Sequence, residues 1–489
     1  MRPRSMGAIM YPGVGTMQIR DRGIEKPDRT VFRLPRIPSL RISLRVPRPR
    51  NALSSAIFLA YAFAGLILLG TILLVLPASS RSGQFTSPLD ALFTATSAVC
   101  ITGLVVVDTA THWSAFGQGV LLILIQIGGI GFVTGATLLL LATGRGLGLR
   151  SKLLLSESMG MDGLGGVLGI VLKVAIFSVV VEGAGAAVFY LLWRSGGGPD
   201  NPLWTAVFQS VSSFNNSGMD IFGNFRSLMD YQSDAAVLLA TSALIIVGGL
   251  GYLIVEDAIR SRSFARLSLE SKLVIIATGS LLAVGTLFFL AAEFSNPATL
   301  GPLGFPQKML VSFFHSVAPR TAGFDAINVA GLRQASLFFT MFLMFVGGAA
   351  GSTAGGIKVN TVGVLVTTAL SSLKGKARVE AFGRQVAEQT VYRSMALVLC
   401  YVSIVGFVVL ALSLTEVFPF GDLLFESVSA LGTVGLTTGI TPNLSIGGRL
   451  IIVAVMFIGR LGPLTLVALL VHRQQPADIS FPHEGVRIG

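Results

Sequence analysis

The chain has 489 residues, of which 52% are hydrophobic and only 12% are charged, and its mean hydropathy is +0.75. Soluble domains carry about 25% charged residues, so these values exclude an ordinary water-soluble globule. The net charge of +12 would suit a nucleic-acid partner, but much of it lies directly before the first apolar segment, where it indicates the cytoplasmic side of a membrane.

Residues 1–50 form a basic arm with twelve Lys and Arg residues against three acidic ones. Its prolines and lack of apolar periodicity predict a cytoplasmic tail that is disordered or lies along anionic lipid. The apolar segment that follows is too long for a signal peptide. We therefore expect membrane lipid as a partner and no nucleic acid.

Eight apolar segments are long enough to cross a bilayer, since a helical span needs about 20 residues. They lie at 54–77, 115–142, 163–193, 234–255, 272–292, 335–370, 393–415 and 446–471. The loops at 143–162, 256–272 and 371–393 are rich in Lys and Arg and fall on the same side as the basic arm. The positive-inside rule then predicts a multi-pass plasma-membrane protein with both termini in the cytoplasm.

The four remaining connections each hold a semi-apolar segment that is too short to cross. They align on four glycines, with a phenylalanine ten residues earlier and a proline 15 to 17 residues earlier. The glycines are Gly103, Gly218, Gly323 and Gly435, the phenylalanines Phe93, Phe208, Phe313 and Phe425, and the prolines Pro88, Pro202, Pro306 and Pro419. Chance recurrence in an apolar chain is the weaker explanation, because three linked offsets match four times.

We therefore predict an all-α polytopic membrane protein of four pseudosymmetric repeats, each a span, a pore helix and a span, around one central pore. This gives eight full spans and four half-spans. The predicted segments are a tail at 1–50, repeats at 51–145, 146–262, 263–376 (with a broken second span) and 377–472, and a cytoplasmic tail at 473–489.

The half-spans suit an ion filter. A helix of about ten residues rises only ~15 Å, so the chain must return through irregular backbone, which is tolerated at that depth where it lines a watery cavity or is buried in protein. Glycine permits the positive φ that such a strand needs. Backbone carbonyls of four such strands can replace the water shell of a monovalent cation, and the negative C-terminal ends of the short helices favour a cation. The expected filter residues are Ile101, Thr102, Gly103, Asn216, Ser217, Gly218, Thr321, Ala322, Gly323, Thr433, Val434 and Gly435.

From about residue 54 to 472 the chain resembles the Trk/Ktr/HKT superfamily of potassium transporters, and "GSTAGGIK" and "MFIGRLGPLTL" resemble its Ktr branch most closely. The resemblance implies potassium uptake by a homodimer with one pore per protomer, gated by a cytoplasmic ring of nucleotide-binding regulatory subunits. In the superfamily a serine at the first filter glycine goes with sodium preference, so Gly103 implies potassium. Sodium is a candidate activator.

The stretch "VGGAAGSTAGGIK" from Val346 to Lys358 interrupts the sixth span. A phosphate-binding loop is excluded because Lys358 is displaced by one position from the required spacing and no Ser or Thr follows it. Small residues could instead pack two helices closely, but the 36-residue apolar run is too long for one span, which favours two helical pieces and an irregular loop. By resemblance the loop is a gate under the filter. The expected gate residues are Gly347, Gly348, Gly351, Ser352, Thr353, Gly355, Gly356, Lys358 and Arg460.

Arg460 interrupts the last span, where an ionisable residue usually has a functional partner. A fixed positive charge below a cation filter raises the barrier to ions and could bind loop carbonyls; an arginine that snorkels to the interface is the alternative. Lys173 and Glu182 also lie in an apolar span, but nine residues separate them, so a direct pair is not expected and neither is assigned a role.

No enzyme is predicted, because the sequence shows no clustered nucleophile, base or metal ligands. Cys100, Cys400 and four scattered histidines give no disulfide framework and no transition-metal site. We expect potassium at the filter carbonyls and no organic cofactor. The alternative function is a secondary transporter that carries a cation or small solute by alternating access; the four half-spans all lie on one side, which favours parallel repeats over inverted ones.

Overall fold

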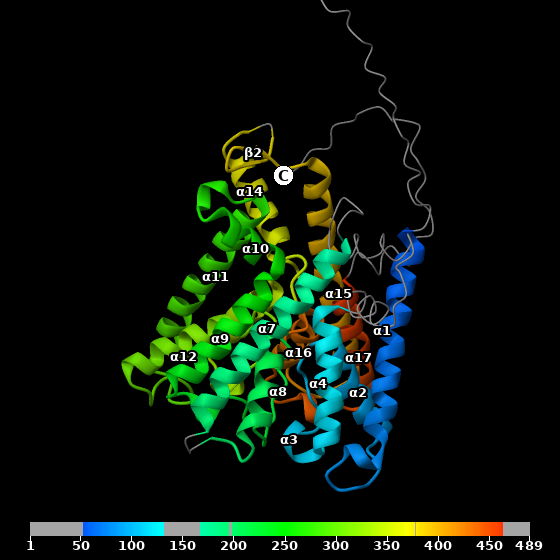
Figure 1. The fold of residues 1–489 in the computed structure, drawn as a ribbon. Coiled ribbons are helices and arrows are strands. Elements are labelled where there is room, and N and C mark those ends of the chain that lie inside the picture. The colour runs from blue at the N-terminus through cyan, green and yellow to red at the C-terminus, as the bar shows by residue number, and fades with distance from the viewer. Residues whose placement is uncertain (1–51, 132–166, 195–197, 377, 463–489) are drawn as a thin grey trace, which may run out of the picture. The chain divides into compact units, whose positions relative to one another are not determined.

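The computed structural model describes residues 52–131, 167–194, 198–376 and 378–462. The predicted tails at 1–50 and 473–489 and the basic loop at 143–162 therefore lie outside the described residues. The described part is almost entirely helical (Figure 1). Its only strands form a hairpin in which β1 (Glu380–Ala381) pairs antiparallel with β2 (Arg384–Gln385).

A pattern of one long helix, one short helix and a third helix of 12 to 16 residues occurs four times along the described part of the chain. The long helices are α1 (Ala52–Val75), α7 (Val167–Trp193), α11 (Leu269–Glu293) and α15 (Glu388–Thr415). The short helices are α2 (Pro88–Val99), α8 (Pro202–Phe214), α12 (Phe305–Val317) and α16 (Phe420–Gly432). The helices that follow them are α4 (Ala115–Ile130), α9 (Ala235–Leu250), α13 (Gln334–Phe345) and α17 (Ile446–Leu461).

The remaining elements connect or extend these helices. They are the helices α3 (Thr109–His112), α10 (Tyr252–Ser261) and α14 (Val359–Leu373) and the short 3-10 turns η1 (Pro77–Ser79), η2 (Met229–Tyr231), η3 (Phe264–Arg266), η4 (Val329–Gly331) and η5 (Thr441–Asn443). In Figure 1, α10, α14 and the β1–β2 hairpin gather at one end of the long helices, and α3 lies at the other.

Among the described residues three helices are long and apolar enough to cross a membrane, at Gly169–Trp193, Leu269–Glu293 and Glu388–Thr415. The bent pair α9 and α10 also passes the test if it is counted as one span. The helices that follow the short ones have only 16, 16, 12 and 16 residues. Sixteen residues rise about 24 Å, which is less than the hydrocarbon thickness of about 30 Å.

The prediction of one continuous span at 234–255 is wrong. Helix α9 ends at Leu250, α10 starts at Tyr252, and the two are bent by 93°. The cause is Gly251, whose φ of +76° and ψ of 160° lie outside the helical region. In the predicted spans at 115–142 and 446–471, helices α4 and α17 end at Ile130 and Leu461, before Gly131 (φ +91°) and Gly462 (φ +85°); residues 132–142 and 463–471 lie outside the described residues.

Gly131, Gly251 and Gly462 each end a five-residue motif that recurs once in each repeat. The four copies read IGGIG at 127–131, VGGLG at 247–251, VGGAA at 346–350 and IGRLG at 458–462. In three copies the first glycine packs against a carbonyl near the end of that repeat's short helix: Gly128 on Val99 O, Gly248 on Phe214 O and Gly459 on Leu431 O. Any side chain there would collide with backbone, so these glycines bring each pair of helices into close contact.

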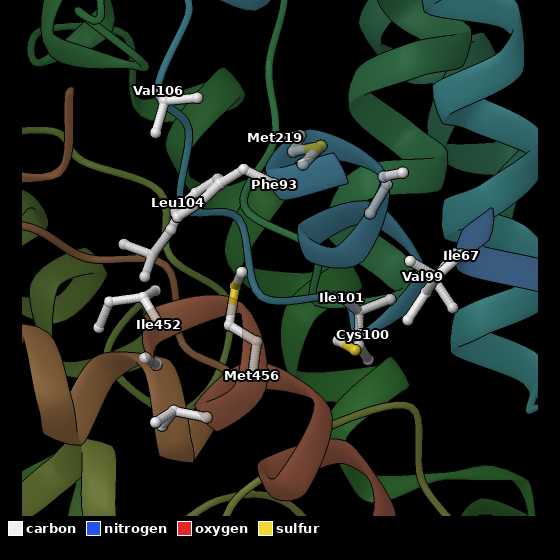
Figure 2. Packing of buried hydrophobic residues seen from close by; sticks show 14 of the residues in the cluster. Ile67, Phe93, Val99, Cys100, Ile101, Leu104, Val106, Met219, Ile452 and Met456 are labelled. Atoms are coloured by element: carbon white, nitrogen blue, oxygen red, sulfur yellow. The ribbon is translucent and has the colours of Figure 1, made fainter. Parts of the chain in front are cut away.

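The core lies around the short helices. Phe93, Phe208 and Phe425, which recur ten residues before the aligned glycines, are fully buried. In the third repeat the buried side chain is Phe314, whereas Phe313 is only half-buried. Figure 2 shows Phe93 beside Leu104 and Met219, and Val99, Cys100 and Ile101 near Ile67. The apolar residue after each glycine is also buried: Leu104, Met219, Phe324 and Leu436.

Candidate ion filter and intramembrane loop

Each short helix begins at a proline and ends close to one of the four aligned glycines. The prolines lie at or next to the first helical position, where a missing N–H costs nothing. Helices α2 and α8 end four residues before their glycines, α16 ends three residues before, and α12 ends six residues before. The partial negative charge of four helix C-termini therefore lies at the start of the predicted filter strands.

The predicted filter strands share an unusual backbone conformation. The residue two positions before each glycine has a positive φ: 51° at Ile101, 55° at Asn216, 69° at Thr321 and 49° at Thr433. The glycines themselves follow at 89°, 72°, 71° and 100°. A left-handed conformation at a β-branched residue such as Ile101 or Thr321 is strained, and such strain gathers at ligand sites. Its recurrence at four equivalent positions points to a shared site.

The four glycines lie in a closed ring. A Cβ built on Gly218 would lie 2.7 Å from Ala322 O, and a Cβ built on any of the other three glycines would lie even closer to a carbonyl oxygen. The contacts run in cyclic order, each glycine against the residue that precedes the next repeat's glycine: Gly103 on Ser217, Gly218 on Ala322, Gly323 on Val434 and Gly435 on Thr102. Thus all twelve predicted filter residues lie in one ring of backbone.

Each filter strand is held from behind by its own short helix. The N–H groups of Thr102, Ser217 and Val434 donate to the carbonyls of Ser97, Ser212 and Ser429, at 2.8, 2.9 and 2.9 Å. The hydroxyls of four residues in the ring are buried without a hydrogen-bond partner: Thr102, Ser217, Thr321 and Thr433. Buried polar atoms are normally paired, so these orphaned oxygens fit a ring that holds a cation or water.

The third strand departs from this pattern. In the other repeats, the N–H of the residue before the glycine donates to the carbonyl five residues earlier. In the third repeat, the N–H of Gly323 itself makes this hydrogen bond, to Ala318 O at 3.1 Å. Helix α12 ends two residues earlier relative to its glycine than α2 and α8 do, and Pro319 and Arg320 fill the gap. The accepting carbonyl and the buried Phe314 both lie one residue closer to the glycine than their counterparts in the other repeats. Alignment on the glycine alone hides this one-residue shift.

The glycine-rich stretch from Val346 to Lys358 is not helical. Helix α13 ends at Phe345 and α14 begins at Val359, so the span is interrupted where the small residues lie and the alternative of two closely packed helices is wrong here. The loop closes on itself, because Gly347 N donates to Ile357 O at 2.8 Å and Val359 N donates to Gly348 O at 2.9 Å. Lys358 Nζ donates to Ala354 O at 2.5 Å within the same loop.

One half of the loop lies directly against the filter. A Cβ on Gly355 would collide with Thr433 Oγ1, and one on Gly347 would lie 3.3 Å from Thr321 Cγ2. Thr353 Oγ1 donates to Phe214 O, the last carbonyl of α8, at 3.1 Å. The loop therefore contacts the second, third and fourth repeats at the base of their strands.

The other half lies beside the bend between α9 and α10. Ala349 N donates to Gly249 O at 2.8 Å, and a Cβ on Gly251 would lie 3.0 Å from Ser352 Cα. Gly351 is exposed, and a Cβ built on it would have no neighbouring atom within 4 Å. Of the predicted gate residues, Gly351 and Ser352 thus lie away from the filter, and the bend at Gly251 makes room for them.

Arg460 binds the loop from the fourth repeat. It lies in the last turn of α17, where a cation is favoured by the helix dipole. Its Nη1 donates to Thr353 O at 2.9 Å, and its Nη2 donates to Gly128 O and, at 3.4 Å, to Gly129 O. Arg460 thus donates to one loop carbonyl, that of Thr353, and the same guanidinium ties the loop to α4.

A second arginine contacts the loop, and the sequence interpretation missed it. Arg320 is 8% exposed, and its Nη2 lies 3.3 Å from Thr278 Oγ1 and 3.5 Å from Gly347 O. Its Nε is buried without a partner. A charged residue between two predicted apolar elements is a functional signal by default, and "APRTAGF" carried that signal directly before the third strand.

A cavity of about 400 Å³ opens beyond the glycine ring, on the side opposite the loop. Its lining includes Asp325, Thr437 and Thr438. Burial, together with the charge of Asp220, raises the pKa of Asp325 well above its usual range. Burial raises the pKa of Asp220 to about 6 against hydrogen bonds that lower it. These two carboxyls follow the second and third predicted filter strands, and burial favours their uncharged form.

The family described as TrkH, cation transport protein, matches residues 47–481. Ktr system potassium uptake protein B of Bacillus subtilis is 39% identical over 431 residues, covering 88% of this chain and 96% of that protein. Potassium/sodium uptake protein NtpJ of Enterococcus hirae is 38% identical and covers 90% and 99%.

A solved structure has the same fold. The potassium transporter TrkH from Vibrio parahaemolyticus superimposes with a TM-score of 0.69, covering 88% of this chain and 87% of that one. Only 20% of the residues are identical. The similarity therefore concerns the arrangement of the helices.

Proposed function

Since this chain belongs to the TrkH family of cation transport proteins, we propose that it takes up potassium across the plasma membrane. It is a helical membrane transport protein rather than an enzyme. Two relatives are named as a potassium uptake protein and a potassium/sodium uptake protein. Potassium is the transported ion in this proposal, and sodium is a candidate activator.

The ring of four glycines carries the proposal. Four strained strands approach one another in cyclic order, and four helix C-termini lie behind them. Carbonyl oxygens and helix dipoles can together replace the hydration of a monovalent cation without a charged side chain at the narrowest point. The twelve filter residues would hold potassium through their backbone.

The loop at 346–358 would act as the gate. It contacts the base of three filter strands and is held by Arg460 and Arg320, whose positive charges oppose a cation that leaves the filter. Glycine-rich backbone can change conformation at little cost. Movement of this loop away from the filter would open the path.

The remaining parts of the proposal concern assembly and orientation. A homodimer and a cytoplasmic ring of nucleotide-binding regulatory subunits are expected from the family resemblance. The basic loops at 256–272 and 371–393 support an orientation with both termini in the cytoplasm. In that orientation α10, α14 and the β1–β2 hairpin would face the regulatory ring.

Cation flux into proteoliposomes tests the function. The purified chain should carry 86Rb⁺ and K⁺ in preference to 22Na⁺, and added sodium should stimulate flux if it is an activator. Absence of potassium flux would refute the proposal. Obligatory exchange, with no net flux under an imposed potassium gradient, would instead favour the alternating-access alternative. Shortening residues 347–356 should raise flux in a folded variant, and unchanged or reduced flux would refute the gate.

A further inference from the structure

One buried carboxylate takes no part in the proposed filter or gate. Glu182 lies near the middle of α7 and is 7% exposed. No ion pair to it occurs among the described residues, and Lys173, nine positions earlier, pairs with Glu256 at 3.5 Å instead. An ionisable side chain at membrane depth is costly and usually has a function, so its surroundings are informative.

Two amide side chains satisfy this carboxylate. Gln126 Nε2, on α4, donates to both oxygens at 3.0 and 3.1 Å. Asn215 Nδ2 donates to Glu182 Oε1 at 3.0 Å and to Gln126 Oε1 at 3.0 Å. Both oxygens of Glu182 therefore accept N–H groups, which is the arrangement that suits a carboxylate. The backbone of Glu182 also accepts Ser210 Oγ at 2.6 Å.

The network leads directly to the second filter strand. Asn215 caps the C-terminus of α8, and Asn216, with its φ of 55°, comes next. The Asn215 side chain lies so close to Gly129 that a Cβ there would collide with it. Asn215 is thus confined between α4 on one side and Glu182 of α7 on the other. The carboxylate therefore restricts the residue from which the strained strand departs.

In the described part of the chain, no other strand is supported by a carboxylate at this position. The residue three places before the glycine is Cys100 in the first repeat and Gly432 in the fourth, and Arg320 in the third points its guanidinium to Thr278 and the loop. The second strand, Asn216 to Gly218, is also the one with polar side chains at both positions before the glycine.

We propose that Glu182 is a positioning residue for ion selectivity. Through the amides of Gln126 and Asn215 it holds the second filter strand at the width that fits a dehydrated potassium ion. This inference rests on the proposed function, because it assigns a role within the proposed filter. Loss of the carboxylate would let the strand relax, so that the smaller sodium ion competes better, while the chain remains folded.

The test compares Glu182→Gln with the wild type in proteoliposomes, reading 86Rb⁺ and 22Na⁺ uptake side by side. Glutamine keeps the size of the side chain but offers one acceptor where the network needs two. The rubidium-to-sodium flux ratio should fall roughly tenfold, equivalent to about 1.4 kcal/mol. Asn215→Ala should cause a similar fall, and the double variant should fall no further, because the two residues act as one unit. Glu388→Gln, at an exposed glutamate in the first turn of α15, is the matched control.

Two results would overturn the inference. One is an unchanged flux ratio in Glu182→Gln, including the case in which both fluxes fall equally, which marks a purely structural anchor. The other is additive loss in the double variant. If Glu182→Gln does not fold, the test uses Gln126→Met, which removes the amide donor to Glu182 at similar volume. A lowered rubidium-to-sodium flux ratio in this variant supports the inference, and an unchanged flux ratio refutes it. If the wild type itself carries no potassium, the proposed function fails rather than this inference alone.

Discussion

Replacement of Arg460 by glutamine should open the proposed gate. Arg460 holds the loop through one hydrogen bond, from Nη1 to Thr353 O at 2.9 Å. Its Nη2 donates to the carbonyls of Gly128 and Gly129 on α4. Glutamine is shorter, has one NH₂ group and carries no charge, so it cannot reach both the loop and α4. The loop would lose its link to α17.

The size of the effect follows from the bond that is lost. A hydrogen bond to a charged group contributes about 1.5–3 kcal/mol, and each 1.4 kcal/mol changes an equilibrium by a factor of about ten. The ratio of closed to open loop should therefore fall by roughly 10- to 150-fold. Loss of the positive charge also lowers the barrier for a cation below the filter, which acts in the same direction. Net 86Rb⁺ flux without regulatory subunits should rise at least tenfold.

The control is Arg449→Gln on the same helix. Arg449 pairs with Asp90 at 2.7 Å and binds the carbonyls of Leu444 and Pro442, far from the loop. This variant should change thermal stability but not the flux per folded molecule. Unchanged or reduced flux in a folded Arg460→Gln variant would refute the argument that Arg460 stabilises a closed loop.

Three further substitutions test other contacts. Gly103→Ser places a side chain at φ +89° against the neighbouring strand, so the 86Rb⁺ to 22Na⁺ uptake ratio should fall roughly tenfold; an unaltered ratio would argue against the filter. Arg320→Gln loses only long contacts of 3.3 and 3.5 Å to the loop and Thr278, so basal flux should rise only about threefold, and a rise as large as that of the Arg460 variant would contradict this ranking. Gly248→Ala forces a methyl group into the last carbonyl of α8, whereas at Gly249 the nearest atom lies 3.4 Å away. Gly248→Ala should lower the melting temperature by several degrees, at a cost of roughly 1–3 kcal/mol. Gly249→Ala should leave the melting temperature little changed, and equal melting temperatures for the two variants would show that the close packing at Gly248 does not matter.

The sequence predicted the short helices well because each has a local signal. A proline at the start, an apolar face and a glycine after the end define α2, α8, α12 and α16 without tertiary information. The interruption at 346–358 was also predictable, since ten small residues weaken a helix and the apolar run was too long for one span. The ring of glycines follows once the four strands are placed around one centre.

Other features depend on backbone conformation or on long-range contacts. Gly251 looks like any glycine in an apolar helix, and only its φ of +76° reveals the 93° bend. The one-residue shift in the third repeat was hidden because alignment on Gly323 pairs Phe313, rather than the buried Phe314, with the other phenylalanines. The link between Glu182 and Asn215 joins residues 33 positions apart on two helices, and no local pattern reports such a pair.

The recurring motif shows where the four repeats cease to be equivalent. The first three copies carry a second glycine, at Gly129, Gly249 and Gly348, and the fourth carries Arg460 in its place. Within the described residues, the third copy alone continues into a loop that reaches the base of the predicted filter. The two departures from symmetry lie in successive repeats, and they meet at the bond between Arg460 and Thr353. One pore needs only one blocking loop and one residue that holds this loop closed, rather than four of each. We therefore place the proposed gate at the bond between Arg460 and Thr353.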